Sequence, residues 1–169
     1  MIIICGTPGT GKTEVAKRLS RFGFTVIHLS EFIIREKLYL NYDVKRNSYV
    51  IDPEKMIKRI LQIKEQEKKL IIEGVGAELI PPEYVDLCIV LICEPKELEK
   101  RLLSKGFSRD KISENLEAER LSIVWGEALD RYGQEKVFVI DTTNLSVDEI
   151  VNIVLDELSR RGLIRRDDG

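Results

Sequence analysis

The sequence predicts a single α/β domain over residues 1–169, and three observations lead to that prediction. Five short apolar runs rich in β-branched residues are spread along the chain, and helical patterns separate them. The runs are continuous rather than alternating, which is typical of parallel strands covered by helices on both faces. A glycine-rich segment follows the first run directly. The composition, with 43% hydrophobic and 33% charged residues, suits one globular domain.

The first predicted strand covers residues 1–5 and leads into the motif G-x-x-x-x-G-K-T at residues 6–13. A helix should follow, because Val15 and Leu19 are spaced to share one buried face. A strand-to-helix turn that binds no ligand is the alternative. The presence of all four fixed positions and of both flanking elements favours a phosphate-binding loop (P-loop), and hence the P-loop NTPase class.

The chemistry of this motif predicts an ATP site that works with Mg²⁺. Backbone N–H groups of the loop would hold the β-phosphate, while Lys12 bridges the β and γ oxygens and Thr13 ligates the metal. The residues expected to contact the nucleotide phosphates are Gly9, Thr10, Gly11, Lys12, Thr13 and Glu14.

The remaining strands are predicted over residues 25–29, 69–74, 86–93 and 136–141, with a helix over 95–105 and a long helix that ends near Tyr132. Two segments interrupt this alternation. Residues 30–66 predict a helical hairpin, whose second helix begins at Asp52-Pro53. Residues 105–112 contain a glycine break and are expected to form a short lid.

Composition also argues against several other classes. No stretch approaches the ~18 apolar residues of a membrane span and no charged leader is evident, so we expect a cytoplasmic protein without membrane contact. A net charge of −2 gives no basic field for nucleic acid. Cys5, Cys88 and Cys93 lie in or beside apolar runs and are expected to be core thiols. The single histidine, His28, is expected to be structural.

Several stretches together carry a resemblance to a known family. They are "GTPGTGKT", "REKLYLNYD", "VID" before the next helix, "KRLLSKGFSRDKISENLEAE" and "VIDTTN", and they span nearly the whole chain. The chain resembles adenylate kinases, and most closely the adenylate kinase isoenzyme six subgroup, the CINAP-like factors associated with ribosome assembly.

The resemblance implies a three-layer α/β/α fold whose five-stranded sheet has the order 2-3-1-4-5. It also implies that the hairpin at 30–66 binds a nucleoside monophosphate. The implied activity is transfer of the γ-phosphoryl group of ATP to AMP by a monomer. The alternative is an ATPase that acts as an ATP-switched ribosome-assembly factor, with a small-subunit ribosomal protein and rRNA as partners. A nuclear location would be open to such a factor in a eukaryotic source.

Arginines at matching positions receive roles from the resemblance. Arg35 falls where the family places an arginine that binds the acceptor phosphate, although a helical arginine on the surface is the plainer alternative. Arg101 matches the arginine that covers the adenine and phosphates of ATP. Lys105 stands where an arginine is usual, so charge is kept there but a bidentate hydrogen bond is not.

Arg109 and Arg120 are eleven residues apart, which is the separation of two phosphate-clamping arginines in longer-lidded adenylate kinases. Helical spacing places Arg120 on an apolar stripe with Ile112, Leu116, Ile123 and Val124. The alternatives are that Arg120 snorkels to solvent or pairs with Glu117 or Glu127. The subgroup commonly has an apolar residue at this position, so the arginine favours phosphoryl transfer.

Glu73 ends the third predicted strand, where a carboxylate can hold Mg²⁺ through water or orient an attacking hydroxyl. A salt-bridged strand end is the alternative. The subgroup usually has Asp-x-His here, with the histidine linked to water activation, whereas this chain has Glu73-Gly74-Val75. Val75 cannot move a proton, and we therefore expect weak ATPase activity in the absence of AMP.

Overall fold

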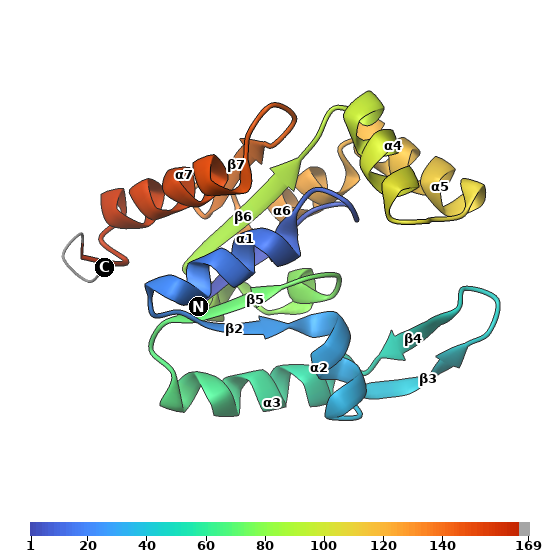
Figure 1. The fold of residues 1–169 in the computed structure, drawn as a ribbon. Coiled ribbons are helices and arrows are strands. Elements are labelled where there is room, and N and C mark those ends of the chain that lie inside the picture. The colour runs from blue at the N-terminus through green and yellow to red at the C-terminus, as the bar shows by residue number, and fades with distance from the viewer. Residues whose placement is uncertain (166–169) are drawn as a thin grey trace.

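The computed structural model describes residues 1–165. Its central sheet is parallel, five-stranded and ordered β2-β5-β1-β6-β7 (Figure 1). The strands are β1 (Ile2–Cys5), β2 (Thr25–His28), β5 (Leu70–Glu73), β6 (Leu87–Ile92) and β7 (Val137–Asp141). Numbered along the chain within this sheet, they have the order 2-3-1-4-5. The predicted fold class and strand order are confirmed.

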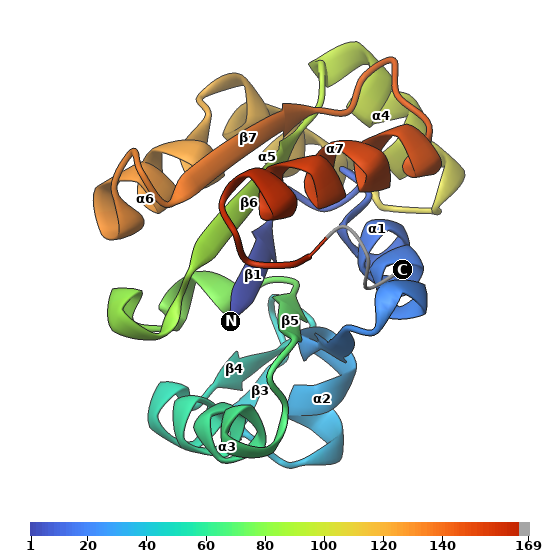
Figure 2. The same ribbon diagram turned by 90° about the vertical axis from the view of Figure 1, so that its left-hand side faces the viewer.

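Helices cover both faces of the sheet and produce the three layers (Figure 2). They are α1 (Lys12–Leu19), α2 (Leu29–Arg35), α3 (Pro53–Gln66), α4 (Pro95–Ser104), α5 (Arg109–Arg120), α6 (Ile123–Tyr132) and α7 (Val147–Arg160), with short 3-10 turns η1 (Ser20–Phe22), η2 (Ala77–Leu79) and η3 (Pro82–Tyr84). Helices α1 and α7 pack on one face, and α2, α3 and α6 pack on the other. Successive residues of β1, such as Ile3 and Ile4, are therefore buried on opposite faces of the sheet.

The segment between β2 and β5 differs from the predicted helical hairpin. Helix α2 ends at Arg35, and Lys37 adopts a left-handed backbone conformation with φ 54° that stops the helix. Strands β3 (Tyr39–Asp43) and β4 (Ser48–Ile51) then form an antiparallel hairpin before α3 begins. The predicted helical hairpin was wrong over residues 39–51, which form paired strands because tyrosines on both arms and β-branched residues on the second arm favour that pairing.

Contacts of side chains in the turn and across the two strands stabilise this β-hairpin. The carboxylate of Asp43 accepts hydrogen bonds from the backbone N–H groups of Lys45 and Arg46, at 3.0 and 3.2 Å. Tyr49 packs against Tyr39 across the two strands, with ring centroids 4.5 Å apart. The hairpin projects from the rest of the molecule (Figure 1).

A second difference concerns the long helix predicted to end near Tyr132. The structure has two helices, α5 and α6, separated at Leu121 and Ser122, and Ser122 has a left-handed φ of 52°. Arg120 is exposed, and the side chain of Ile123 is 42% exposed. The apolar stripe predicted to include Arg120 therefore does not continue past α5.

Two further predictions concern the cysteines and membrane-spanning helices. All three cysteines are buried with free thiols, which confirms that they are core residues. No helix within residues 1–165 combines the length and the apolar character needed to cross a membrane.

Candidate active site

The P-loop connects β1 to α1 at the carboxyl edge of the sheet, and its glycines are required by geometry. Gly9 and Gly11 have left-handed φ values of 92° and 104°, which side chains disfavour. A Cβ atom on Gly9 would also lie 2.9 Å from side-chain carbons of Leu98 and Leu102. The loop is thus packed closely against α4.

Lys12 is buried within this loop and is only 8% exposed. Its Nζ donates hydrogen bonds to the carbonyl oxygens of Gly6 and Thr7, at 2.6 and 3.2 Å. Burial lowers the pKa of Lys12, while the nearby carboxylate of Glu73 acts in the opposite direction. The ammonium is therefore held at the point where phosphate oxygens would replace the carbonyls as its partners.

Glu73 brings the second part of the site together. It ends β5 between two neighbours in the sheet, Ile4 of β1 and His28 of β2. Its Oε1 accepts a hydrogen bond from the hydroxyl of Thr13 at 3.2 Å and lies 2.7 Å from Nδ1 of His28. The carboxylate is almost completely buried. The structure thus places the two predicted metal-binding residues, Thr13 and Glu73, in direct contact.

The contact between His28 and Glu73 was missed in the sequence, where His28 was interpreted as structural. The available signal was that both residues end apolar runs of the same sheet. Parallel strands that are adjacent and in register bring their last residues side by side, but adjacency of β2 and β5 had to be known first.

The donor set of Thr13 and Glu73 fits a magnesium ion. A hydroxyl and a carboxylate are the hard oxygen ligands that Mg²⁺ prefers, and the ion usually takes its other ligands from phosphates and water. Groups of three or more His, Cys, Asp or Glu side chains able to hold a metal do not occur within residues 1–165. A single hydroxyl and a single carboxylate suit a metal that takes its other ligands from phosphates and water.

A pocket on the α4 side of the P-loop contains the predicted donor residues. Gly9, Gly11, Glu14, Arg101 and Lys105 all line it. Lys105 also borders the neighbouring cleft over the P-loop, which Lys12, Thr13 and Glu73 line. These lining residues make a continuous surface from the α4 pocket to the cleft that Lys12 and Glu73 line.

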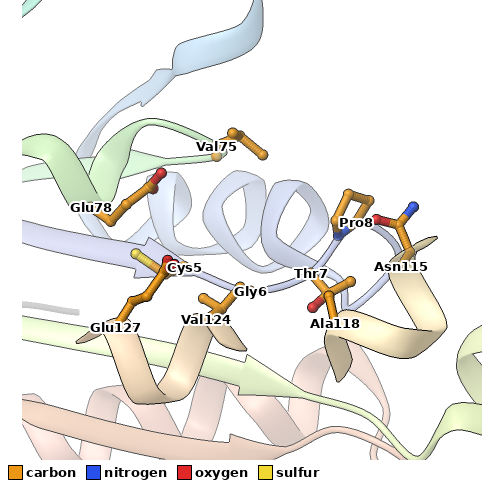
Figure 3. A pocket seen from close by; sticks show the side chains of 11 residues that line it. Cys5, Gly6, Thr7, Pro8, Val75, Glu78, Asn115, Ala118, Val124 and Glu127 are labelled. Atoms are coloured by element: carbon orange, nitrogen blue, oxygen red, sulfur yellow. The ribbon is translucent and has the colours of Figure 1, made fainter. Parts of the chain in front are cut away.

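A further pocket lies on the other side of the P-loop (Figure 3). Asn115 and Ala118 reach it from α5, and Val124 and Glu127 reach it from α6. Val75 borders both this pocket and the cleft over the P-loop, and its side chain is 63% exposed. An apolar side chain therefore occupies an open position beside Glu73.

The remaining predicted arginines lie on two helices, α2 and α5. Arg35 ends α2 and lies over the ring of Phe32 at 5.6 Å, while Arg109 and Arg120 are the first and last residues of α5. All three are exposed, and among residues 1–165 none of them forms a hydrogen bond or an ion pair. The structure does not bring them onto the P-loop, and their roles in catalysis stay predictions.

Comparison with known sequences identifies relatives over nearly the whole chain. Residues 2–122 match the family described as AAA domain. The protein named "Putative adenylate kinase" from Methanocaldococcus jannaschii is 39% identical over 161 residues, covering 95% of this chain and 86% of the relative. The protein of the same name from Methanosarcina acetivorans is 40% identical over 164 residues, covering 94% and 87%.

Solved structures show the same fold at lower sequence identity. Thymidylate kinase from Candida albicans superposes with a TM-score of 0.63 at 14% identity, covering 95% of this chain and 91% of that chain. Shikimate kinase from Bacteroides thetaiotaomicron has a TM-score of 0.63 at 18% identity, with 94% and 97% covered. Together with the P-loop site, the sequence relatives show that this protein is a phosphotransferase and that the chain belongs to the adenylate kinase family.

Proposed function

We propose that the protein transfers the γ-phosphoryl group of ATP to AMP and so forms two molecules of ADP. The observation that carries this proposal is the convergence of Lys12, Thr13 and Glu73 in one cleft, next to the α4 pocket. An oxygen of the AMP phosphate attacks the γ-phosphorus in line, and the bridging oxygen leaves with ADP. No covalent intermediate with the protein is needed.

The described residues fall into three groups, which bind the donor nucleotide, the metal and the acceptor nucleotide. Arg101 and Lys105 hold the donor nucleotide in the α4 pocket, and Lys12 contacts its β and γ oxygens. Thr13 and Glu73 hold Mg²⁺, which neutralises phosphate charge when it is bound. Arg35 receives the acceptor phosphate as a bidentate partner.

Arg109 and Arg120 complete the proposal as a clamp on the transferred group. Their charges are uncompensated by any ion pair within residues 1–165, so they are available to an incoming phosphate. They are the first and last residues of α5, which packs against α4 beside the donor pocket. A modest movement of this helix pair would carry the charges toward the cleft, as lids do in many phosphotransferases.

A coupled assay with AMP, CMP, UMP, GMP and dAMP as acceptors tests the proposal. We expect AMP to be preferred, turnover to require Mg²⁺, and Lys12→Ala to abolish it by removing the charge shared by the β and γ oxygens. Lys17→Ala is the matched control, because Lys17 lies exposed on the same helix. Preference for a pyrimidine acceptor, or no transfer at all, would contradict the proposal.

A second candidate is an ATPase that drives ribosome assembly through a protein partner. The supporting observation is the exposed β3–β4 hairpin, where Leu40, Tyr42 and Val44 are 64%, 43% and 81% exposed. Clustered exposed apolar side chains suit contact with a protein. The two candidates differ in their need for AMP, since the assembly ATPase would release phosphate rapidly without it.

A further inference from the structure

We propose that His28 is a positioning residue that orients the Glu73 carboxylate for Mg²⁺. This inference rests on the proposed function, because it concerns the metal that accompanies the nucleotide. It assigns a task to the single histidine of the chain, which lies outside the P-loop motif.

Both hydrogen bonds to the Glu73 carboxylate fall on the same oxygen. Oε1 lies 2.7 Å from Nδ1 of His28 and 3.2 Å from the hydroxyl of Thr13. Because the partner is a carboxylate, Nδ1 of His28 carries the proton and donates. The hydroxyl of Thr13 likewise donates to Oε1, which leaves its lone pairs available to a metal.

The other oxygen, Oε2, accepts no hydrogen bond from residues 1–165. Within that part of the chain, no buried side-chain oxygen or nitrogen lacks a partner. Oε2 is therefore at least partly accessible, although the Glu73 side chain is only 4% exposed, and Glu73 lines the cleft over the P-loop. A water molecule of a hydrated magnesium ion could donate to this oxygen.

His28 is well placed to maintain this orientation. His28 is the last residue of β2, in register with Glu73, and it also occupies the N-cap position of α2. The backbone before and after it is therefore part of regular secondary structure. Its side chain is 24% exposed, compared with 4% for Glu73. A carboxylate held on one oxygen by both His28 and Thr13 presents the other oxygen in a defined direction, as ligands of bound metals commonly require.

The inference predicts a specific defect when His28 is removed. Glu73 would then keep only the longer hydrogen bond from the hydroxyl of Thr13, at 3.2 Å, to fix its orientation. The contribution of Mg²⁺ to nucleotide binding should therefore fall, while binding of the nucleotide without metal should not, since His28 does not line the described P-loop cleft or the α4 pocket.

The test uses three variants of the full chain, His28→Asn, His28→Gln and His28→Ala. The amide N–H of asparagine can take the place of Nδ1, whereas that of glutamine corresponds to Nε2. The Kd of ADP is measured by titration calorimetry with Mg²⁺ and with EDTA. We expect His28→Ala and His28→Gln to lose about 10-fold of the metal-dependent gain in affinity and His28→Asn to retain most of it.

Metal-free Kd and the melting temperature distinguish positioning from folding. Equal weakening of ADP binding with and without Mg²⁺ would overturn the inference in favour of a structural role. Unchanged metal dependence in all three variants would overturn it as well. Should His28→Ala fail to fold, the comparison of the Asn and Gln variants still decides. If wild type shows no gain from Mg²⁺, the proposed function fails instead, so the two failures are distinguishable.

Discussion

Arg101 joins α4 to the loop after β7 through Thr142. One terminal nitrogen of its guanidinium donates to the hydroxyl of Thr142 at 3.1 Å, and the other donates to the carbonyl oxygen of Thr142 at 3.0 Å. Glu97, one turn earlier on α4, accepts from Nε at 3.3 Å. The residue expected to cover the donor nucleotide is therefore already held in the α4 pocket by partners on two elements.

For this reason we expect Arg101→Ala to raise the KM for ATP by about 10- to 150-fold, the range of a charge-assisted hydrogen bond of 1.5–3 kcal/mol. Thr142→Val is the informative partner variant. It removes the hydroxyl but keeps the carbonyl acceptor, so its effect should be about 2- to 10-fold. Steady-state kinetics with ATP varied at saturating AMP measure both. A larger effect on AMP than on ATP would place Arg101 outside the donor site.

Arg35 should act on the acceptor alone. Loss of its bidentate contact in Arg35→Ala should raise the KM for AMP by about 10- to 150-fold and leave that for ATP nearly unchanged. Arg35→Lys should fall between, because a lysine keeps the charge without the planar fork. The measurement varies each nucleotide separately. An equal rise in the KM for AMP and the KM for ATP would show that the segment around Arg35 is not the acceptor site.

Val75 should limit hydrolysis, since an open position next to Glu73 is occupied by a side chain that cannot accept a proton. A general base typically contributes 10²–10⁴-fold, so we expect weak phosphate release by wild type without AMP and a measurable gain in Val75→His. Val75→Asn is the control, because it is polar but does not act as a base. Rapid AMP-independent release by wild type would favour the assembly ATPase.

Glu157 near the end of α7 should make stability depend on pH. Hydrogen bonds from Arg160, at 2.9 and 2.7 Å, and from Arg161 lower the pKa of Glu157 from 4.5 to about 2. Because the folded pKa lies below the unfolded one, the unfolded state binds more protons in this range. The stabilisation is complete above about pH 5 and is lost as the pH falls through about 2.

We therefore expect Glu157→Gln to lower the free energy of unfolding by about 2 kcal/mol at pH 7 and to flatten its pH dependence between about pH 5 and pH 2. Urea denaturation at several pH values measures the difference. Glu114→Gln is the control, because Glu114 is exposed on α5. An identical pH dependence for Glu157→Gln and wild type would contradict the prediction.

Much of this protein could be predicted from local patterns in the chain. The P-loop was identifiable because its chemistry needs glycines, a lysine and a threonine at fixed spacing after a strand. The five sheet strands were evident because strands buried on both faces must be continuous and apolar. Asp52 before Pro53 marked the start of α3, and its side chain does accept a hydrogen bond from the N–H of Lys55.

Features that depend on contacts between distant residues could not be predicted in this way. The local pattern of residues 39–51 is helical or polar, but these residues form a β-hairpin because β3 and β4 pair with each other. The break at Ser122 follows from a left-handed backbone conformation that no local pattern required. His28 and Glu73 are 45 residues apart in the chain and meet only because β2 and β5 pair in register. The P-loop motif thus predicted a phosphate site from local sequence. The contacts among Thr13, Glu73 and His28 beside it depend on which strands become neighbours, because sheet pairing joins residues whose separation along the chain carries no signal of contact.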